Sequence, residues 1–167
     1  MDMSRGTFPE ITFQPIGTIH SPYTDIAGMP IQPVGARGIR GTIELREDLA
    51  GGLADLTVFT HLILIYALHR CTGYNLTVKP FLDPTPRGIF ATRSPKRPNP
   101  IGLSIVRLVG IQGAVLTIEN VDILDGTPLL DIKPYVPTFD SYPDAGCGWF
   151  GPVAQNAESV KSDNRFR

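Results

Sequence analysis

The chain has 167 residues, the size of one ordinary domain, and 42% of them are hydrophobic, which is enough for a buried core. Its formal net charge of −1 excludes a general nucleic-acid binder held by bulk positive charge, so any RNA recognition has to use a local basic patch. Two cysteines without a Cys-x-x-Cys pair argue against a disulfide framework and a structural zinc site, and we expect no metal.

Neither the start of the chain nor its longest apolar run carries a membrane signal. The run Leu62–Leu68 is too short to span a bilayer, and Met1–Glu10 has acidic residues and no apolar signal-peptide core. We therefore expect a soluble, cytoplasmic protein. Its predicted organisation is an N-terminal arm over residues 1–10, one domain over residues 11–152 and a loose polar tail over residues 153–167.

The predicted elements in the first half of the chain are mostly strands. Gln14–His20 is expected to open the fold, and Thr42–Leu45 alternates polar and apolar residues as a half-buried strand does. Glu47–Leu56 suggests a short helix. Thr57–Arg70 is apolar on both faces, so a buried helix is possible, but its β-branched and aromatic content favours a strand covered on both sides.

Strands are also expected in the second half. Short ones are predicted at Thr77–Val78 and at Ile89, and longer ones at Ile101–Val109 and Val115–Glu119. The 16 prolines and 17 glycines favour turns over long helices. Many short strands separated by proline-rich loops predict an all-β fold, a barrel or a sandwich with few short helices.

The segment Arg93–Gly102 is the first candidate site. It carries the cations Arg93, Lys96 and Arg97 on a loop that three prolines make rigid. A rigid loop with converging cations suits an anionic partner such as a carboxylate or a phosphate. The alternative is a solvated basic loop without a function.

A second candidate site is acidic. Asp122, Asp125 and Asp131 surround an Asp-Gly turn, and carboxylates in loops commonly bind ribose hydroxyls. The alternative is a turn in which Asp131 pairs with Lys133 across a strand surface. His69 ends the long apolar run, where a barrel strand would place ligand contacts, and a structural role for it is equally open.

Taken together, these segments resemble the TsaA-like domain of the TrmO family, in the family's order and over most of the chain. The matching motifs are Ile16-Gly17, Ser21–Tyr23, Met29-Pro30, Gln32-Pro33, Phe59 with His61, Phe90–Ser94, Arg97–Gly102, Asp125–Pro128 and Asp131–Tyr135.

The resemblance implies a small β-barrel that binds S-adenosylmethionine without a Rossmann domain and forms a homodimer. It implies methylation of N6 on a threonylcarbamoyl-modified adenosine beside the tRNA anticodon. The cofactor contacts that it implies are Gln32, Pro33, His69, Arg70, Arg93, Leu103, Asp122 and Asp125.

Further roles are hypotheses within that resemblance. Asn99 or Asp125 is a candidate catalytic acceptor for an N–H of the weakly nucleophilic adenine amine. Lys96 and Arg97 are candidates for RNA phosphates. Trp149 and Phe150, large apolar residues in a glycine-rich segment, support a homodimer.

The sequence departs from the family pattern in two ways. Thr60 stands where Ser is usual, and from the 167 residues we expect no further C-terminal domain of the kind that the bacterial tRNA enzymes carry. Two alternatives therefore stay open: a sensor module that binds S-adenosylmethionine without turning it over, and a methyltransferase for a smaller, non-tRNA substrate.

Overall fold

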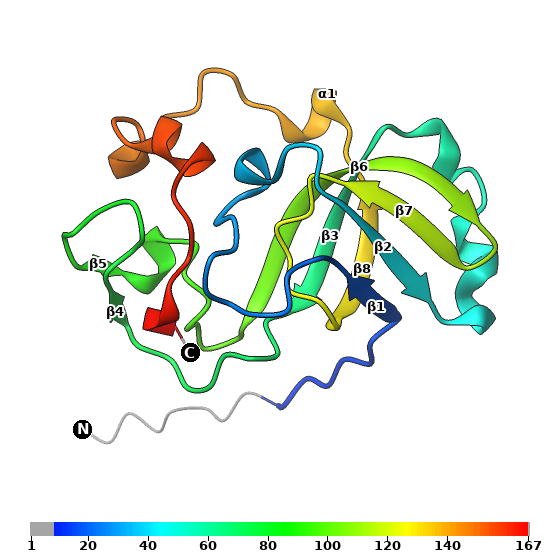
Figure 1. Ribbon diagram of the computed structural model, residues 1–167, viewed down its shortest axis with the longest axis horizontal. Coiled ribbons are helices and arrows are strands. Elements are labelled where there is room, and N and C mark those ends of the chain that lie inside the picture. Colours follow the sequence, from blue (N-terminus) through cyan, green and yellow to red (C-terminus); the bar gives the residue numbers. More distant parts are fainter. Residues whose placement is uncertain (1–8, 167) are drawn as a thin grey trace.

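Six antiparallel strands close into a small barrel, with long loops beyond one of its ends (Figure 1). The computed structural model describes residues 9–166, so most of the predicted N-terminal arm lies outside the described residues. The strand order around the barrel is β1-β2-β7-β6-β3-β8. Their bounds are β1 Gly17–His20, β2 Arg40–Leu45, β3 His61–Ala67, β6 Ile101–Gln112, β7 Val115–Glu119 and β8 Thr127–Pro134. The predicted all-β barrel with few short helices is confirmed.

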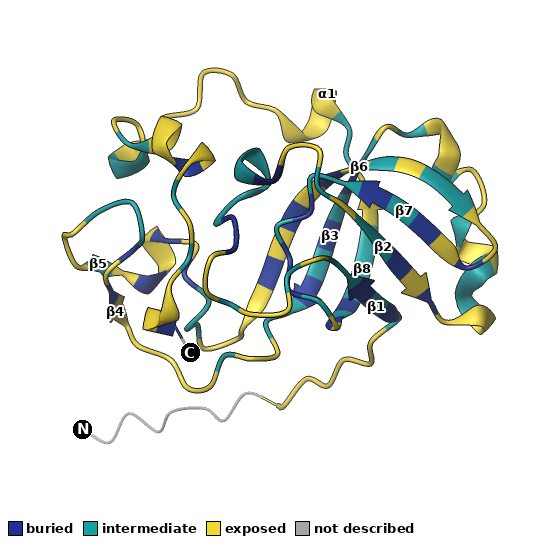
Figure 2. Ribbon diagram, in the orientation of Figure 1, coloured by how far each residue is buried: buried dark blue, intermediate teal, exposed yellow. Residues whose placement is uncertain are grey.

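Alternation along the strands separates the inside of the barrel from its outside. In β3 the side chains of Leu62, Leu64 and Tyr66 belong to the buried core, whereas Ile63 and Ile65 between them are only partly buried. Buried and more exposed residues also alternate along β6 and β7 (Figure 2). The register of β3 on β6 therefore determines which inward residues meet on the barrel wall.

The strand predictions agree well with the barrel. The strand favoured within Thr57–Arg70 is confirmed as β3, and those at Thr42–Leu45, Ile101–Val109 and Val115–Glu119 are confirmed as β2, β6 and β7. The strand predicted at Gln14–His20 is confirmed in a shorter form, as β1. The sequence gives no signal for β8, because its two prolines and its charged residues resemble a loop.

Two local predictions differ in detail from the structure. The short helix predicted at Glu47–Leu56 is present as the 3₁₀ helix η2 Glu47–Leu53, and it is separated from η3 Leu56–Val58 by Asp55, whose φ of 63° is left-handed. Ile89 is not in a strand but begins the 3₁₀ helix η4, Ile89–Ala91.

The remaining elements are short and lie mainly in the loops. β4 Thr77–Val78 and β5 Arg87–Gly88 form a two-stranded sheet separate from the barrel. The short helices are η1 Pro33–Ala36, α1 Pro137–Asp140, η5 Gly148–Phe150, η6 Ala154–Glu158 and η7 Asn164–Phe166. Over residues 9–166, no helix has the length and hydropathy to cross a membrane.

The end of the chain differs from the predicted loose tail. Ala157 and Phe166 are buried, and Ser162 forms hydrogen bonds with the loop that contains Met29. Residues 153–166 are therefore packed against the loops at the end of the barrel. The polar composition predicts a tail because only these few side chains anchor the segment.

Candidate functional site

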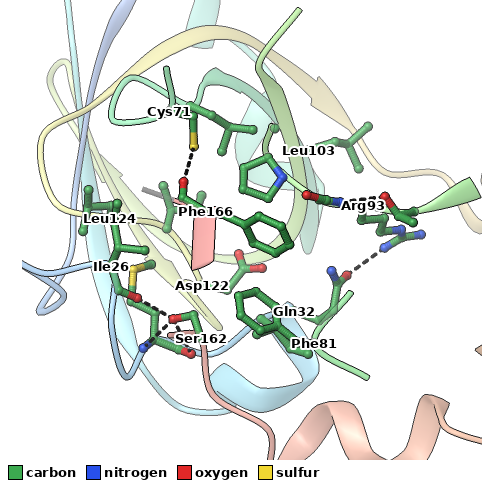
Figure 3. A pocket seen from close by; sticks show the side chains of 18 of the residues that line it. Ile26, Gln32, Cys71, Phe81, Arg93, Leu103, Asp122, Leu124, Ser162 and Phe166 are labelled. Carbon is green, nitrogen blue, oxygen red and sulfur yellow. Dashed lines mark hydrogen bonds between the residues drawn. The ribbon is translucent and has the colours of Figure 1, made fainter. Parts of the chain in front are cut away.

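A pocket of about 490 Å³ opens at one end of the barrel, within the size range of small-molecule sites. Its floor comes from the end of β3, the start of β6 and the loop after β7. Other segments supply its walls: the loop before η1, the loop after β4, the Arg93–Gly102 loop, the segment of Trp149 and Phe150, and the end of the chain. Figure 3 shows these side chains converging from segments far apart in the sequence.

Arg93 and Gln32 join two walls of the pocket. Nη1 of Arg93 donates a hydrogen bond of 2.8 Å to Oε1 of Gln32 (Figure 3). The prolines of the Arg93–Gly102 loop restrict its backbone, and Gln32 immediately precedes η1, which begins at Pro33. The Arg93 guanidinium retains further donors, which suit a carboxylate.

A buried polar chain runs from the barrel interior to the pocket. The hydroxyls of Tyr66 and Ser104 lie 2.9 Å apart, and Ser104 donates to Oδ1 of Asp122 at 2.7 Å. Burial raises the pKa of Asp122 to about 6, although the Ser104 hydrogen bond and the Arg93 guanidinium oppose the rise. The pocket thus has a carboxylate that is oriented from behind and ionised at neutral pH.

Gly102 makes room for this polar chain. In the barrel register Gly102 lies opposite Tyr66, and a Cβ atom added to Gly102 would come within 2.1 Å of the Tyr66 ring. The ring therefore occupies the space of a side chain at position 102. This gives a packing reason for the glycine that ends the Arg97–Gly102 motif.

His69 and Arg70 line the pocket just beyond β3, as predicted, and both are exposed. Partial burial and the neighbouring Arg70 guanidinium lower the pKa of His69. Leu103 also lines the pocket, from the outer face of β6.

Four predicted site residues do not line the pocket: Asn99, Asp125, Pro33 and Lys96. The carboxylate of Asp125 accepts hydrogen bonds from the backbone N–H of Ser21 and from His20, and it thereby holds a turn outside the pocket. The predicted catalytic role of Asn99 and Asp125 is not supported by these positions. Both lie in the predicted motifs, but sequence proximity to a pocket residue does not set the direction of a side chain.

Arg97 differs from its predicted role in RNA binding. Its Nη1 lies within hydrogen-bonding distance of the backbone carbonyls of Ile89, Thr92 and Ser94, with the shortest contact of 2.8 Å at Thr92. The guanidinium is therefore part of the folded loop. Lys96 has no ion pair or side-chain hydrogen bond within residues 9–166, although its charge acts on the Cys71 thiol, so its ammonium group has donors for a partner.

The three aspartates of the predicted acidic site have different surroundings. Asp131 pairs with Lys133 at 2.7 Å on β8, which is the alternative that gives this carboxylate no ligand. Asp122 alone of the three aspartates lines the pocket. No group of three His, Cys, Asp or Glu side chains in the described part of the chain is placed to hold a metal ion.

Among the lining residues, Tyr66, Phe81, Ser162 and Phe166 were not predicted. Ser104, which bonds Asp122 from behind the pocket, was not predicted either. For Tyr66 and Ser104 a signal exists, because both place a hydroxyl at an inward position of an apolar strand. Phe166 is the one aromatic residue of the polar segment 153–167, which is a weaker signal.

Comparison with known proteins identifies the family to which the chain is related. Residues 18–141 match the tRNA-methyltransferase O N-terminal domain. A Pyrococcus abyssi protein described as a probable S-adenosyl-L-methionine-binding protein is 48% identical over 156 residues, covering 93% of this chain and 85% of that protein. An Escherichia coli relative, described as tRNA (adenine(37)-N6)-methyltransferase, is 36% identical over 163 residues, covering 90% and 69%.

Solved structures agree with the sequence comparison. The crystal structure of TrmO from Pseudomonas aeruginosa is similar with a TM-score of 0.72 and 37% identity, covering 84% of this chain and 63% of that one. This chain therefore spans less than two thirds of that solved protein. The domain match, the identity and the shared barrel show that the chain belongs to the tRNA-methyltransferase O N-terminal domain family.

Proposed function

We propose that this chain is an S-adenosylmethionine-dependent methyltransferase that acts on tRNA, and that the barrel-end pocket holds the cofactor. The observation that carries the proposal is one pocket in which the Arg93 guanidinium and the enclosed Asp122 carboxylate stand among apolar walls. The relatives from Pyrococcus abyssi and Escherichia coli support the cofactor and the tRNA substrate respectively.

The donor set of the pocket fits this cofactor. Arg93 has free donors for a carboxylate, and Asp122 is an acceptor for ribose hydroxyls or an ammonium group. Leu68, Leu103 and Leu124 offer apolar surface to a flat base. When bound, the cofactor supplies a methyl group on a sulfonium.

The contribution of the chain to the reaction is mainly positioning. Methyl transfer requires in-line approach of a nucleophile, and correct orientation alone removes a large part of the barrier. The acceptor that we propose is N6 of a threonylcarbamoyl-modified adenosine next to the anticodon, since the Escherichia coli relative is described as acting at adenine 37. Lys96, whose ammonium group makes no ion pair within residues 9–166, is the proposed contact with RNA phosphates.

A smaller acceptor is the second candidate, and one observation favours it. Three cations near the pocket or on the barrel have internal partners: Arg87 with Asp83, Arg107 with Glu119, and Arg97 with loop carbonyls. With a net charge of −1, these three cations add little to a surface for tRNA. Salt-insensitive binding of the acceptor would support this candidate.

We also propose a homodimer. Trp149 and Phe150 no longer supply the reason, because their rings stack at 3.8 Å and Nε1 of Trp149 donates to the carbonyl of Ala91. The support comes instead from the outer face of β6, where Ile101, Leu103, Ile105 and Val109 are 37–57% exposed in one row that also holds Arg107, which is paired with Glu119.

Calorimetric titration with S-adenosylmethionine tests the cofactor assignment. Arg93→Ala should weaken binding, because it removes the guanidinium that faces the pocket. Arg46→Ala is the matched control, since Arg46 pairs with Asp48 and does not line the pocket. Absence of saturable binding to the wild-type protein at millimolar cofactor would refute the proposed function.

A further inference from the structure

The C-terminal segment, Lys161–Phe166, lies along the pocket and contacts two of its walls. Ser162 and Phe166 both line the cavity. In Figure 1 this segment, drawn in red, runs between the loop that precedes β2 and the region of β4 and β5.

The first contact joins the segment to the loop of Ile26 to Pro30. The backbone N–H of Ser162 donates to the carbonyl of Met29 at 2.8 Å, and Gly28 N–H donates to the carbonyl of Ser162 at 2.8 Å. The Ser162 hydroxyl donates to the carbonyl of Ile26 and accepts from Met29 N–H at 3.0 Å (Figure 3). These bonds add a short strand-like pairing to the wall that carries Gln32.

The second contact joins it to the opposite wall. Phe166 is 6% exposed and packs with Val78 and Ile89, and its ring meets that of Phe81 at 5.0 Å and 79°. Arg165 donates to the carbonyl of Pro80 at 3.1 Å. Hydrophobic packing therefore anchors the segment to the part of the chain that also carries Phe81.

The two walls belong to different parts of the fold. β4 and β5 pair only with each other, in a sheet separate from the barrel. The segment that contains them leads to Arg93, whereas Gln32 lies on the other wall; the 2.8 Å hydrogen bond between these two side chains is exposed. An exposed hydrogen bond contributes little by itself, so the C-terminal segment, with Ser162 bonded to one wall and Phe166 buried against the other, is the stronger connection.

We propose that the C-terminal segment is part of the cofactor site, and that Phe166 is a positioning residue for S-adenosylmethionine. This inference rests on the proposed function of the pocket. Phe166 holds the Phe81 wall in place against the Gln32 wall before the ligand arrives. Without Phe166, the two walls would become ordered only when the cofactor binds. The free-energy cost of that ordering would then lower the affinity.

Phe166→Ala is the direct test, with Asn164→Ala as control because Asn164 is exposed on the same short helix. Phe166→Ala should raise the cofactor dissociation constant and KM by about tenfold, an order-of-magnitude expectation for a lost preorganising contact. The kcat at saturating cofactor should be unchanged, and Phe166→Leu should restore most of the affinity. A loss of folded protein alone would lower kcat and leave KM unchanged.

Hydrogen exchange on the wild-type protein gives a second measurement that does not depend on a variant. Added S-adenosylmethionine should slow amide exchange at Ser162 and in residues 26–30. Wild-type binding together with unchanged affinity in Phe166→Ala, or with unchanged exchange in both segments, would overturn the inference and leave the proposed function intact. No binding to the wild-type protein would instead refute the proposed function itself.

Discussion

The hydroxyl of Ser104 lies 2.7 Å from Oδ1 of Asp122 and donates a hydrogen bond to it from inside the barrel. Ser104 is almost fully buried, and its other partner is the Tyr66 hydroxyl. The barrel core therefore orients a carboxylate that faces a ligand pocket, and this arrangement makes the site sensitive to pH and to packing.

Cofactor affinity should depend on pH through Asp122. Its pKa is about 6, so the ionised form that accepts hydrogen bonds is lost, and affinity falls, as pH drops below about 6. The charged group that acts on it is Arg93, whereas the Asp122 carboxylate itself helps to raise the pKa values of Tyr66 and Tyr23. Ser104→Ala removes a bond to the charged form, so the fall should begin at higher pH. Calorimetry between pH 5 and 8 measures the cofactor affinity of both proteins. Identical affinity profiles for wild type and Ser104→Ala would contradict the role of Asp122 in cofactor binding.

Asp122→Asn should stabilise the protein while weakening cofactor binding. The folded-state pKa of Asp122 is raised above its unfolded value, so folding costs free energy above about pH 6 and none below about pH 4. The cost is about 3 kcal/mol at most. The variant should melt several degrees higher than wild type at pH 7, and the difference should vanish near pH 4. An unchanged or lower Tm at pH 7 would contradict this.

Gly102→Ala should be destabilising, because its Cβ would overlap the Tyr66 ring. Overpacking of this kind costs about 1–3 kcal/mol, and displacing the ring should also disturb Ser104 and weaken cofactor binding. Gly110→Ala on the same strand is the control, since no atom lies within 4 Å of its Cβ position. Equal denaturant midpoints for the two variants would show that the close approach has no energetic consequence.

Substitutions of Lys96 and of Arg97 should affect different properties of the protein. Lys96→Ala should lower tRNA affinity and reduce the salt slope by about one unit, while leaving cofactor affinity unchanged. Arg97→Ala should lower Tm and cofactor affinity, because three backbone carbonyls of the loop lose their guanidinium partner. Filter binding at several salt concentrations and calorimetry test both. The reverse pattern would return Arg97 to its predicted role at the RNA surface.

The outer face of β6 should form the dimer contact. Ile105→Glu places a charge in the exposed apolar row and should give a monomer, without loss of the barrel, because the side chain points outward. Thr18→Glu on β1 is a control, since Thr18 lies between the buried Gly17 and Ile19 and also faces outward. Light scattering reports the mass. A wild-type monomer at micromolar concentration would refute the homodimer.

Much of the barrel could be predicted because alternation with period two is local. Val115–Glu119 shows it within five residues, and the β-branched content of the segment before Arg70 favours a strand. β8 could not be predicted, because Pro128 and the Asp131–Lys133 pair conceal its alternation. The strand becomes evident only when its neighbours β1 and β3 are in place.

The candidate site was predictable only in part, for a related reason. Gln32, Arg93 and Asp122 belong to sequence motifs and do line one pocket. The contact of Ser104 with Asp122 depends on strand register, and that of Phe166 with Phe81 depends on how the end of the chain packs. Neither is encoded in a short stretch of sequence. Asp125 shows the converse, because it lies three residues from Asp122 and contacts His20 outside the pocket.

Methyl transfer to tRNA tests the central claim most directly. The purified protein would be incubated with methyl-labelled S-adenosylmethionine and total tRNA from a strain that lacks its own enzyme of this family. The account predicts label in tRNA, recovered as an N6-methylated adenosine derivative, and strongly reduced label with Arg93→Ala. Saturable cofactor binding with no label above the Arg93→Ala background would contradict it and would leave a sensor module or a smaller acceptor as the function of the pocket.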